Sequence, residues 1–214
     1  LISQGLAKPE EILALTFTDK SAGEMEERVD LLLPAGYVNT WISTFHAFCE
    51  RLLKDYALDI GLPSDFRLLS SSEQWMLMRN NLECFNLNYY RPRGNPTRFI
   101  HALLSHFSRA KDEMILPQDY LQYVEGLKLD TDNDPSLRDA TTSLSDDEVK
   151  RLWEVANAYH IYQQMLLENN ALDFGDLINY TLELLRARPQ VLKLLREKFK
   201  YILVDEFQDT NYAQ

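Results

Sequence analysis

The sequence predicts an α/β protein whose parallel sheet is interrupted along the chain by an all-helical insertion. Two short apolar runs, at residues 12–17 and 201–204, are too short for helices and are typical of strands buried within a parallel sheet. Residues 62–168 between them show helical patterns and no convincing strand. Because strand and helix patterns alternate on both sides of this stretch, we expect the first and last segments to share one sheet.

A helix is expected over residues 18–33, directly after the first strand. Its apolar side chains recur every three to four positions, at Ala22, Met25, Val29 and Leu32. Ser21 and Glu24 have the spacing of a capping box, and Thr18 is an alternative N-cap. The Pro-Ala-Gly sequence at residues 34–36 predicts the end of this helix.

A second strand and a second helix follow, at residues 38–43 and 45–56. The helical insertion then contains two further capping boxes, Ser70 with Glu73 and Ser145 with Glu148. The second box precedes an apolar stripe that we expect in a helical core: Val149, Leu152, Ala156, Tyr159, Tyr162 and Leu166.

An acidic stretch at residues 126–147 is typical of a surface loop or a loosely ordered connector. A helix is expected at residues 173–186, with Asp173 as its N-cap, ahead of the strand at 201–204. These patterns predict three segments along the chain: 1–61 in the α/β domain, 62–155 in the insertion, and 156–214 returning to the first domain.

The composition is that of an ordinary globular protein. Of 214 residues 45% are apolar, which argues against a disordered chain, and two cysteines are too few for a disulfide framework. No apolar run reaches the ~18 residues of a membrane span, and the N-terminus lacks the pattern of a signal peptide. We therefore expect a cytoplasmic protein without a membrane partner.

The net charge of −11 conceals a basic stretch at residues 84–111. No acidic residue lies within it, and its cations alternate with aromatic residues. The cations are Arg91, Arg93, Arg98, Arg109 and Lys111, and the aromatic residues include Tyr89, Tyr90, Phe99 and Phe107. Such a local basic field can bind a phosphate backbone whatever the total charge, although a solvated face that balances the acidic stretch is an equally simple interpretation.

The last strand ends in two adjacent carboxylates, Asp205 and Glu206. We expect this strand to be a buried, central one, which would place both acids at the carboxyl edge of the sheet, where α/β folds bind ligands. In nucleotide hydrolysis, one such acid holds Mg²⁺ through water, and the next orients or deprotonates the attacking water. Two acids after a strand are a weak signal by themselves.

The wider sequence resembles a known family. DEFQDTN at residues 205–211 resembles motif II of the superfamily 1 DNA helicases of the UvrD/Rep type. Three other segments resemble family motifs in the same order: TFTDKSAGEM at 16–25, STFHAFC at 43–49 and ALDFGDL at 171–177. Asp19 stands where the family usually has Asn, and Ser43 where it usually has Gly. The resemblance covers essentially the whole chain.

The resemblance implies part of a RecA-like P-loop NTPase sheet with an inserted all-α subdomain. It implies an ATP-dependent DNA helicase that moves 3′ to 5′ along single-stranded DNA, with ATP and Mg²⁺ as cofactors. Asp205 would hold Mg²⁺ through water, Glu206 would activate water and share the metal site, and Gln208 would sense the terminal phosphate. Contacts to single-stranded DNA would come from Phe17, Thr18, Thr44 and His46.

Ordinary structural roles remain open for two of these residues: Phe17 as the last core residue of its strand and His46 as a helix-terminal histidine. The insertion faces DNA in this family, so the resemblance favours duplex or backbone contacts by the five cations of the basic stretch. We therefore expect partners in single-stranded DNA, a duplex junction and ATP, and weak DNA binding that falls steeply with salt.

One element of the family is missing. None of the seven glycines precedes a lysine, so the 214 residues contain no GxxxxGK[ST] phosphate-binding loop. We expect the chain to be an excised, monomeric and inactive fragment with no tightly bound cofactor. Two alternatives remain open: the motor half of a helicase–nuclease, and a non-hydrolysing module that binds DNA or assembles with other proteins.

Overall fold

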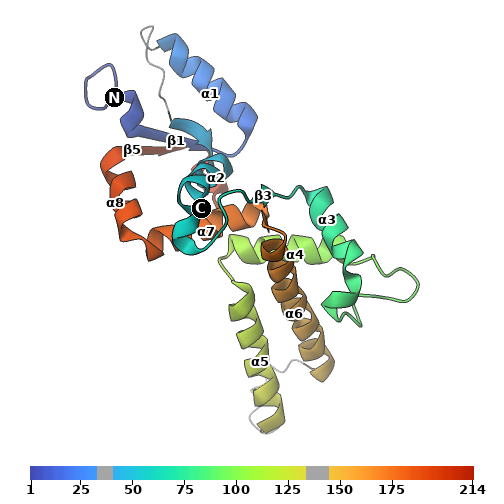
Figure 1. Cartoon of the computed structure of the whole chain (residues 1–214). Helices are drawn as coiled ribbons and strands as arrows, with labels where there is room; N and C mark the ends of the chain where they lie inside the picture. Colours follow the sequence, from blue (N-terminus) through green and yellow to red (C-terminus); the bar gives the residue numbers. More distant parts are fainter. Residues whose placement is uncertain (33–40, 134–144) are drawn as a thin grey trace. The chain divides into compact units, whose positions relative to one another are not determined.

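The computed structural model describes residues 1–32, 41–133 and 145–214 (Figure 1). The chain divides into two compact units. The α/β unit comprises Leu1–Asp65 and Asp176–Gln214, and the helical unit comprises Phe66–Gly175.

The boundaries of the units differ from the predicted ones mainly on the C-terminal side. The predicted boundary after residue 155 falls inside one continuous helix, α6 (Asp146–Glu168). The whole of this helix belongs to the helical unit, and the chain returns to the α/β unit only at Asp176.

The elements of the α/β unit follow the predicted alternation. They are η1 (Pro9–Glu11), β1 (Ile12–Thr16), α1 (Asp19–Leu32), β2 (Trp41–Thr44), α2 (Phe45–Tyr56), η2 (Ala57–Ile60), most of α7 (Phe174–Ala187), α8 (Pro189–Lys198), β5 (Tyr201–Val204) and η5 (Phe207–Asp209).

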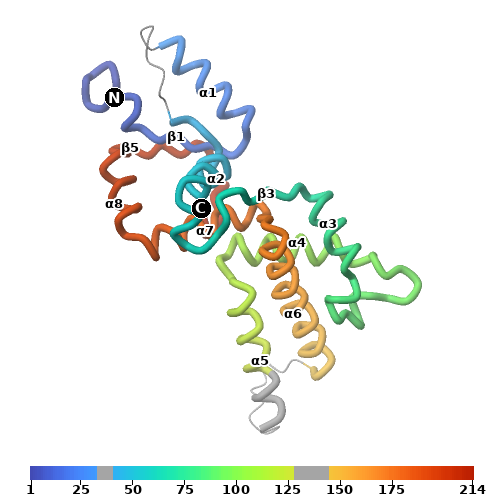
Figure 2. Tube along the Cα trace, viewed as in Figure 1, coloured from blue at the N-terminus to red at the C-terminus, as the bar shows by residue number. Residues whose placement is uncertain are grey.

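The sheet of this unit joins segments from both ends of the sequence. Its described strands are parallel and run in the order β2-β1-β5, with Thr16 beside Thr44 and Leu15 beside Val204. Figure 2 shows the blue β1 and the red β5 side by side. The prediction that the first and last segments share one sheet is confirmed.

The prediction that β5 is a buried central strand is wrong for the described sheet. The central strand is β1, with Leu13, Ala14 and Leu15 buried, whereas β5 lies at an edge. Ile202 is 62% exposed and Leu203 is 51% exposed. An apolar run therefore identified the strand but not its position, because apolar composition does not specify which neighbours cover a strand.

Helices cover both faces of this sheet. Met25 and Val29 of α1 line a cavity of about 480 Å³ together with Ala14 and Leu203 on one face. On the other face, α2, α7 and α8 line a cavity of about 360 Å³ with Leu13, Leu15, Ile202 and Val204. The helix α1 is capped by Thr18, whose Oγ1 accepts a hydrogen bond from the Ser21 amide at 3.0 Å. Thr18 is thus the N-cap; Leu33 and the predicted stop at 34–36 lie outside the described residues.

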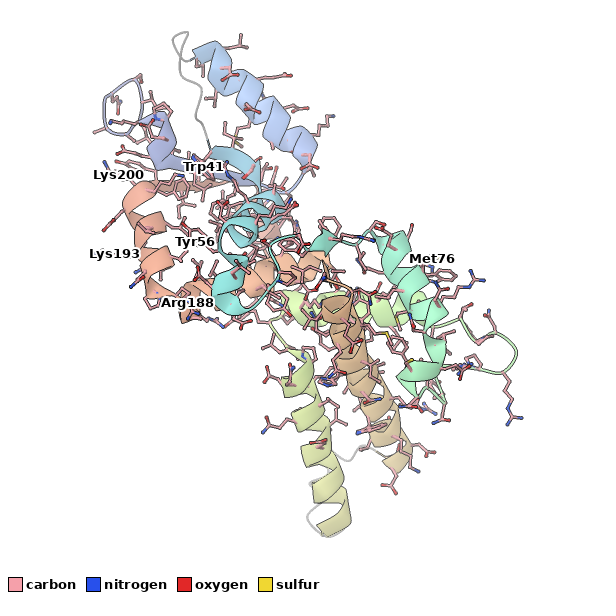
Figure 3. The ribbon with its side chains drawn as sticks, in the orientation of Figure 1. Trp41, Tyr56, Met76, Arg188, Lys193 and Lys200 are labelled. Carbon is pink, nitrogen blue, oxygen red and sulfur yellow. The ribbon has the colours of Figure 1, made fainter. Side chains whose placement is uncertain are left out.

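The strand β2 begins at Trp41, which Figure 3 labels. Of the predicted strand at 38–43, residues 38–40 lie outside the described part of the chain. Two cations lie over the Trp41 ring: the Arg51 guanidinium at 3.8 Å and the Lys198 ammonium at 3.7 Å from its centroid. These contacts tie α2 and the end of α8 to the amino end of β2.

The elements of the helical unit are, in chain order, β3 (Arg67–Leu68), α3 (Ser71–Asn80), η3 (Leu82–Phe85), α4 (Ile100–Asp112), α5 (Pro117–Asn133), α6 and β4 (Ala171–Leu172). The expectation of no strand between residues 62 and 168 is wrong, because β3 pairs in parallel with β4. A two-residue strand leaves no periodic pattern in a sequence.

The acidic stretch at residues 126–147 is also more helical than predicted. The helix α5 continues to Asn133, and α6 begins at Asp146 behind its Ser145 cap. Residues 134–144 of the predicted loop lie outside the described residues.

The core of the helical unit forms around stacked aromatic rings. Phe107 of α4 stacks on Tyr159 and Tyr162 of α6, with ring centroids 5.0 and 5.4 Å apart, and all three are fully buried. Both predicted capping boxes of this unit, at Ser70 and Ser145, are confirmed. Among the helices of the described residues, none has the length and apolar character that crossing a membrane requires.

Candidate functional site

The carboxyl ends of the parallel strands of the α/β unit all lie along the same side of the sheet. We call this side the carboxyl edge, or simply the edge. Thr16 and Thr44 are paired at the ends of β1 and β2, and Asp205 follows β5 directly. The Asp205 amide donates a hydrogen bond to the Leu15 carbonyl at 2.9 Å, which extends the pairing of β5 with β1 by one residue. The segments predicted to bind DNA follow β1 and β2, and the segment predicted to bind nucleotide follows β5. All three segments therefore begin at the same edge of the sheet.

The two predicted catalytic carboxylates are both exposed at this edge. The backbone of Glu206 lies in the left-handed region, with φ 50°, and the chain then turns into η5. A side chain other than glycine in this region costs on the order of 1–2 kcal/mol, and such strain concentrates at functional sites.

Gln208 lies within hydrogen-bonding reach of the second carboxylate. Its Nε2 donates a hydrogen bond to Oε2 of Glu206. Both side chains are exposed, so this contact leaves them accessible to a ligand. The three predicted catalytic residues thus lie in one short, exposed segment.

The carboxylates of Asp205 and Glu206 suit Mg²⁺ in chemical type. Mg²⁺ prefers oxygen ligands and usually keeps several waters, so one or two protein carboxylates together with phosphate oxygens are sufficient to hold it. Within the described residues, no group of three or more His, Cys, Asp or Glu side chains is arranged to hold a metal ion. Asp205 and Glu206 therefore fit Mg²⁺ by the chemistry of their oxygen ligands.

The threonines at this edge serve as helix caps. Thr44 is buried, and its Oγ1 accepts a hydrogen bond from the Ala47 amide at 3.2 Å, at the start of α2. Thr18 is exposed and caps α1. The Oγ1 atom of each threonine already accepts a hydrogen bond from a backbone amide. Either threonine would therefore contact DNA in addition to capping its helix.

Phe17 and His46 lie close to these caps. The Phe17 ring is half-buried, and its centroid is 5.5 Å from that of Phe45, the first residue of α2. His46 is half-buried in the first turn of the same helix. Phe17 therefore packs against the first residue of α2 and remains partly exposed.

The cations of the basic stretch have different environments in the helical unit. Arg91 pairs with Glu83, and this hydrogen bond lowers the pKa of the Glu83 carboxyl. Arg93 is exposed on the loop before α4, and Arg98 is exposed with its guanidinium 5.2 Å from the Phe99 ring centroid. Arg109 is exposed on α4.

The fifth cation, Lys111, is not available as a DNA contact, so this prediction is wrong. Its side chain is 1% exposed, and its Nζ lies 2.7 Å from Oδ2 of Asp173. A sequence signal did exist: Lys111 lies on the apolar stripe of α4, four residues after Phe107. The prediction counted charges along the sequence and did not consider which face of the helix each residue occupies.

One buried acid of this region was absent from the sequence-based prediction. Glu154 of α6 is buried, and its carboxylate accepts hydrogen bonds from backbone amides of the basic stretch. No pattern in the sequence marks Glu154, because α6 carries several other charged residues. The partner of Glu154 could not be inferred, because it lies more than sixty residues away along the chain.

Comparison with known proteins identifies the family of this chain. The model of the family described as the UvrD/REP helicase N-terminal domain matches residues 1–214. The chain belongs to this family. The α/β unit is accordingly a partial RecA-like helicase domain, as the resemblance implied.

Curated relatives of this UvrD/REP chain are named as DNA helicases. It is similar to the ATP-dependent DNA helicase PcrA of Bacillus subtilis (strain 168), with 35% identity over 215 residues, which covers 100% of this chain and 25% of the relative. It is also similar to a probable DNA helicase II homolog of Rickettsia felis, with 36% identity over 218 residues, covering 100% of this chain and 28% of the relative. The chain thus spans about a quarter of the length of these relatives.

Proposed function

We propose that this UvrD/REP chain is the portion of an ATP-dependent DNA helicase that carries the magnesium-binding and water-activating carboxylates. The observation that carries the proposal is the position of Asp205 and Glu206, directly after β5 at the edge where β1 and β2 also end. Ligands of open α/β sheets bind outside the carboxyl ends of the strands. The names of the relatives support ATP as the nucleotide and DNA as the substrate.

In this proposal, each residue of the edge has a separate task. Asp205 holds Mg²⁺ through water, and the metal, when bound, neutralises charge on the phosphate oxygens. Glu206 accepts a proton from the attacking water at a carboxylate oxygen. Gln208 senses the terminal phosphate, and its contact with Glu206 links this phosphate to the proposed base.

The helicase proposal includes a DNA path across the same edge. Phe17 would stack on a base, a contact worth about 1–3 kcal/mol, while Thr18, Thr44 and His46 would contact the backbone. In the helical unit, exposed arginines would contact phosphates. We propose 3′-to-5′ translocation and duplex unwinding for the full-length protein.

Replacement of the proposed base tests the catalytic assignment. In the full-length protein, Glu206→Gln keeps the shape of the side chain but removes its ability to accept a proton. We expect kcat for DNA-stimulated ATP hydrolysis to fall about 100- to 10,000-fold, with little change in KM for ATP. The matched control is Glu10→Gln, at an exposed residue of η1. Hydrolysis by Glu206→Gln at the rate of the control would overturn the assignment.

Nucleotide binding by the 214 residues alone provides a second test. Because these residues contain no GxxxxGK[ST] loop, they lack the backbone amides and lysine that bind phosphates in this family. We expect calorimetry with Mg-ATP to show no Kd tighter than about 1 mM. Micromolar binding would contradict this part of the proposal.

A further inference from the structure

The loop that carries most of the basic stretch is fixed to α6 through a buried carboxylate. We define the arginine loop as residues 86–99, between η3 and α4. Glu154 accepts hydrogen bonds from the backbone amides of Asn88 at 3.1 Å, Tyr89 at 3.0 Å and Tyr90 at 3.4 Å. Glu154 is only 8% exposed. Burying a carboxylate is costly unless hydrogen-bond donors satisfy it, and here three successive amides of the loop do so.

A second contact from the same helix holds the side chains of the loop. The Arg151 guanidinium, one turn before Glu154, lies 4.0 Å from the Tyr89 ring centroid. The Tyr89 ring stacks on Phe99, with centroids 6.1 Å apart, and Tyr90 meets both rings edge-on. The two ends of the arginine loop are therefore joined through their rings, and α6 supports both its backbone and this aromatic cluster.

The loop held in this way presents positive charge. It contains Arg91, Arg93 and Arg98 and no acidic residue. Arg93 and Arg98 are exposed, whereas Arg91 pairs with Glu83 outside the loop. Phosphate contacts by arginine depend on geometry as well as charge, because the guanidinium donates through a planar fork.

We propose that Glu154 is a positioning residue for nucleic-acid binding: it fixes the arginine loop in the conformation that presents Arg93 and Arg98 to a phosphate backbone. Glu154 itself touches no phosphate. This inference rests on the proposed function, in which the helical unit contacts DNA, and it assigns that contact to a specific loop with a specific support.

The proposal and simple electrostatics predict opposite results when Glu154 is removed. Glu154→Ala deletes a negative charge near a basic surface, so charge alone predicts tighter binding of DNA. If Glu154 acts by positioning, the loop amides lose their acceptor, the arginines lose their fixed geometry, and binding weakens. The sign of the change in affinity therefore separates the two roles.

The experiment measures binding of a fluorescein-labelled single-stranded oligonucleotide by anisotropy, in salt from ~50 mM upwards. For Glu154→Ala we expect Kd to increase about tenfold, and the slope of log K against log salt to become shallower by about one for each phosphate that the arginines no longer bind. The matched control is Glu125→Ala on α5, which removes the same charge from an exposed position in the same unit. We expect its Kd to stay unchanged or to decrease.

Limited trypsin digestion reports the state of the loop independently of DNA. Trypsin cleaves after arginine, and the Arg93–Gly94 bond lies at the exposed part of the loop. We expect faster cleavage there in Glu154→Ala than in the Glu125→Ala control, with cleavage elsewhere unchanged. Glu154→Gln, which keeps one acceptor oxygen, should give intermediate results in both assays and replaces Glu154→Ala if that variant does not fold.

A further variant distinguishes failure of this inference from failure of the proposed function. In one outcome, Arg93→Ala weakens binding, whereas Glu154→Ala shows faster cleavage of the loop and still binds DNA as tightly as the Glu125→Ala control. The positioning role would then be wrong, and the proposed DNA interface would stand. If neither Arg93→Ala nor Arg98→Ala changes Kd, the arginine loop does not contact nucleic acid, and both the inference and this part of the interface are wrong.

Discussion

Lys111 and Asp173 form a buried ion pair, with 2.7 Å between Nζ and Oδ2. The Tyr162 hydroxyl donates a hydrogen bond to the same carboxylate oxygen at 3.1 Å, and the Lys111 ammonium lies 5.4 Å from the Tyr162 ring centroid. The pair links the end of α4 to the residue directly before α7. Lys111 of the basic stretch and Asp173 of the segment at 171–177 therefore have a structural role in common.

Breaking this pair should strongly destabilise the helical unit. Lys111→Ala leaves the Asp173 carboxylate buried without its cation, and we expect the free energy of unfolding to fall by about 3–5 kcal/mol. Lys150→Ala is the control, because Lys150 pairs with Asp147 at an exposed site and should cost less than about 1 kcal/mol. Urea denaturation followed by circular dichroism measures both. Equal midpoints for the two variants would exclude a stabilising role for the pair.

Gly175 should not tolerate a methyl group while Lys111 is in place. A Cβ at position 175 would lie 2.8 Å from Cδ and 2.9 Å from Cβ of Lys111. We therefore expect Gly175→Ala to destabilise by about 1–3 kcal/mol, whereas Gly94→Ala, which meets no atom within 4 Å, should not introduce a clash. The effect of Gly175→Ala should shrink in part in a Lys111→Ala background, which removes Cδ and Cγ but keeps Cβ, as a double-mutant cycle of unfolding free energies would show. Strictly additive effects would mean that the clash is relieved elsewhere.

The cap of α2 should contribute measurably to stability. Thr44→Ala removes the oxygen that accepts from the Ala47 amide, and we expect a decrease of about 1 kcal/mol in the free energy of unfolding. Thr44→Ser keeps the oxygen and should recover most of this decrease, which identifies the hydrogen bond as the cause. Thermal unfolding of the three proteins tests this, and no difference between the alanine and serine variants would disprove it.

The two cysteines should differ in reactivity. Cys84 is exposed, whereas burial raises the pKa of the Cys49 thiol to about 11. Because the thiolate is the reactive form, iodoacetamide at pH 8 should label Cys84 and leave Cys49 unmodified until the chain unfolds. Mass spectrometry of tryptic peptides provides the readout. Rapid labelling of Cys49 in the folded chain would show that its site opens readily.

The raised pKa of Cys49 also has a consequence for stability. An unfolded cysteine titrates near ~8.5, so above that pH the unfolded state loses a proton that the folded state keeps. The contribution of Cys49 to stability is therefore complete below this pH and decreases as the pH rises towards 11. Cys49→Ala should reduce the fall in stability over this range.

Local sequence patterns predicted several elements correctly because those elements depend on close neighbours. The capping boxes at Ser70 and Ser145 each join residues three positions apart, and both are present. At α1, two caps were compatible with the spacing, and the hydrogen bond from the Ser21 amide to Thr18 Oγ1 identifies Thr18 as the cap. The short strand β3 was missed because its stability depends on pairing with β4, about a hundred residues later.

The candidate site was predicted in part for the same reason. Asp205, Glu206 and Gln208 are almost contiguous, so their proximity follows from the sequence. The basic stretch was also recognised, but its five cations were treated as equivalent. Their environments differ because Arg91 pairs with Glu83, eight residues before it, whereas Lys111 is buried against Asp173, 62 residues after it.

The order of the motifs by itself determined the family, the class of the fold and the identity of the two edge carboxylates, since each of these depends on residue type and spacing. The tertiary structure alone decided that β1 is the central one of the described strands, that Lys111 is buried, and that Glu154 accepts hydrogen bonds from the arginine loop. The physical reason is burial. Whether a charged side chain faces water or a partner depends on which distant segments pack against it. Residue types and spacing along the sequence do not indicate these contacts.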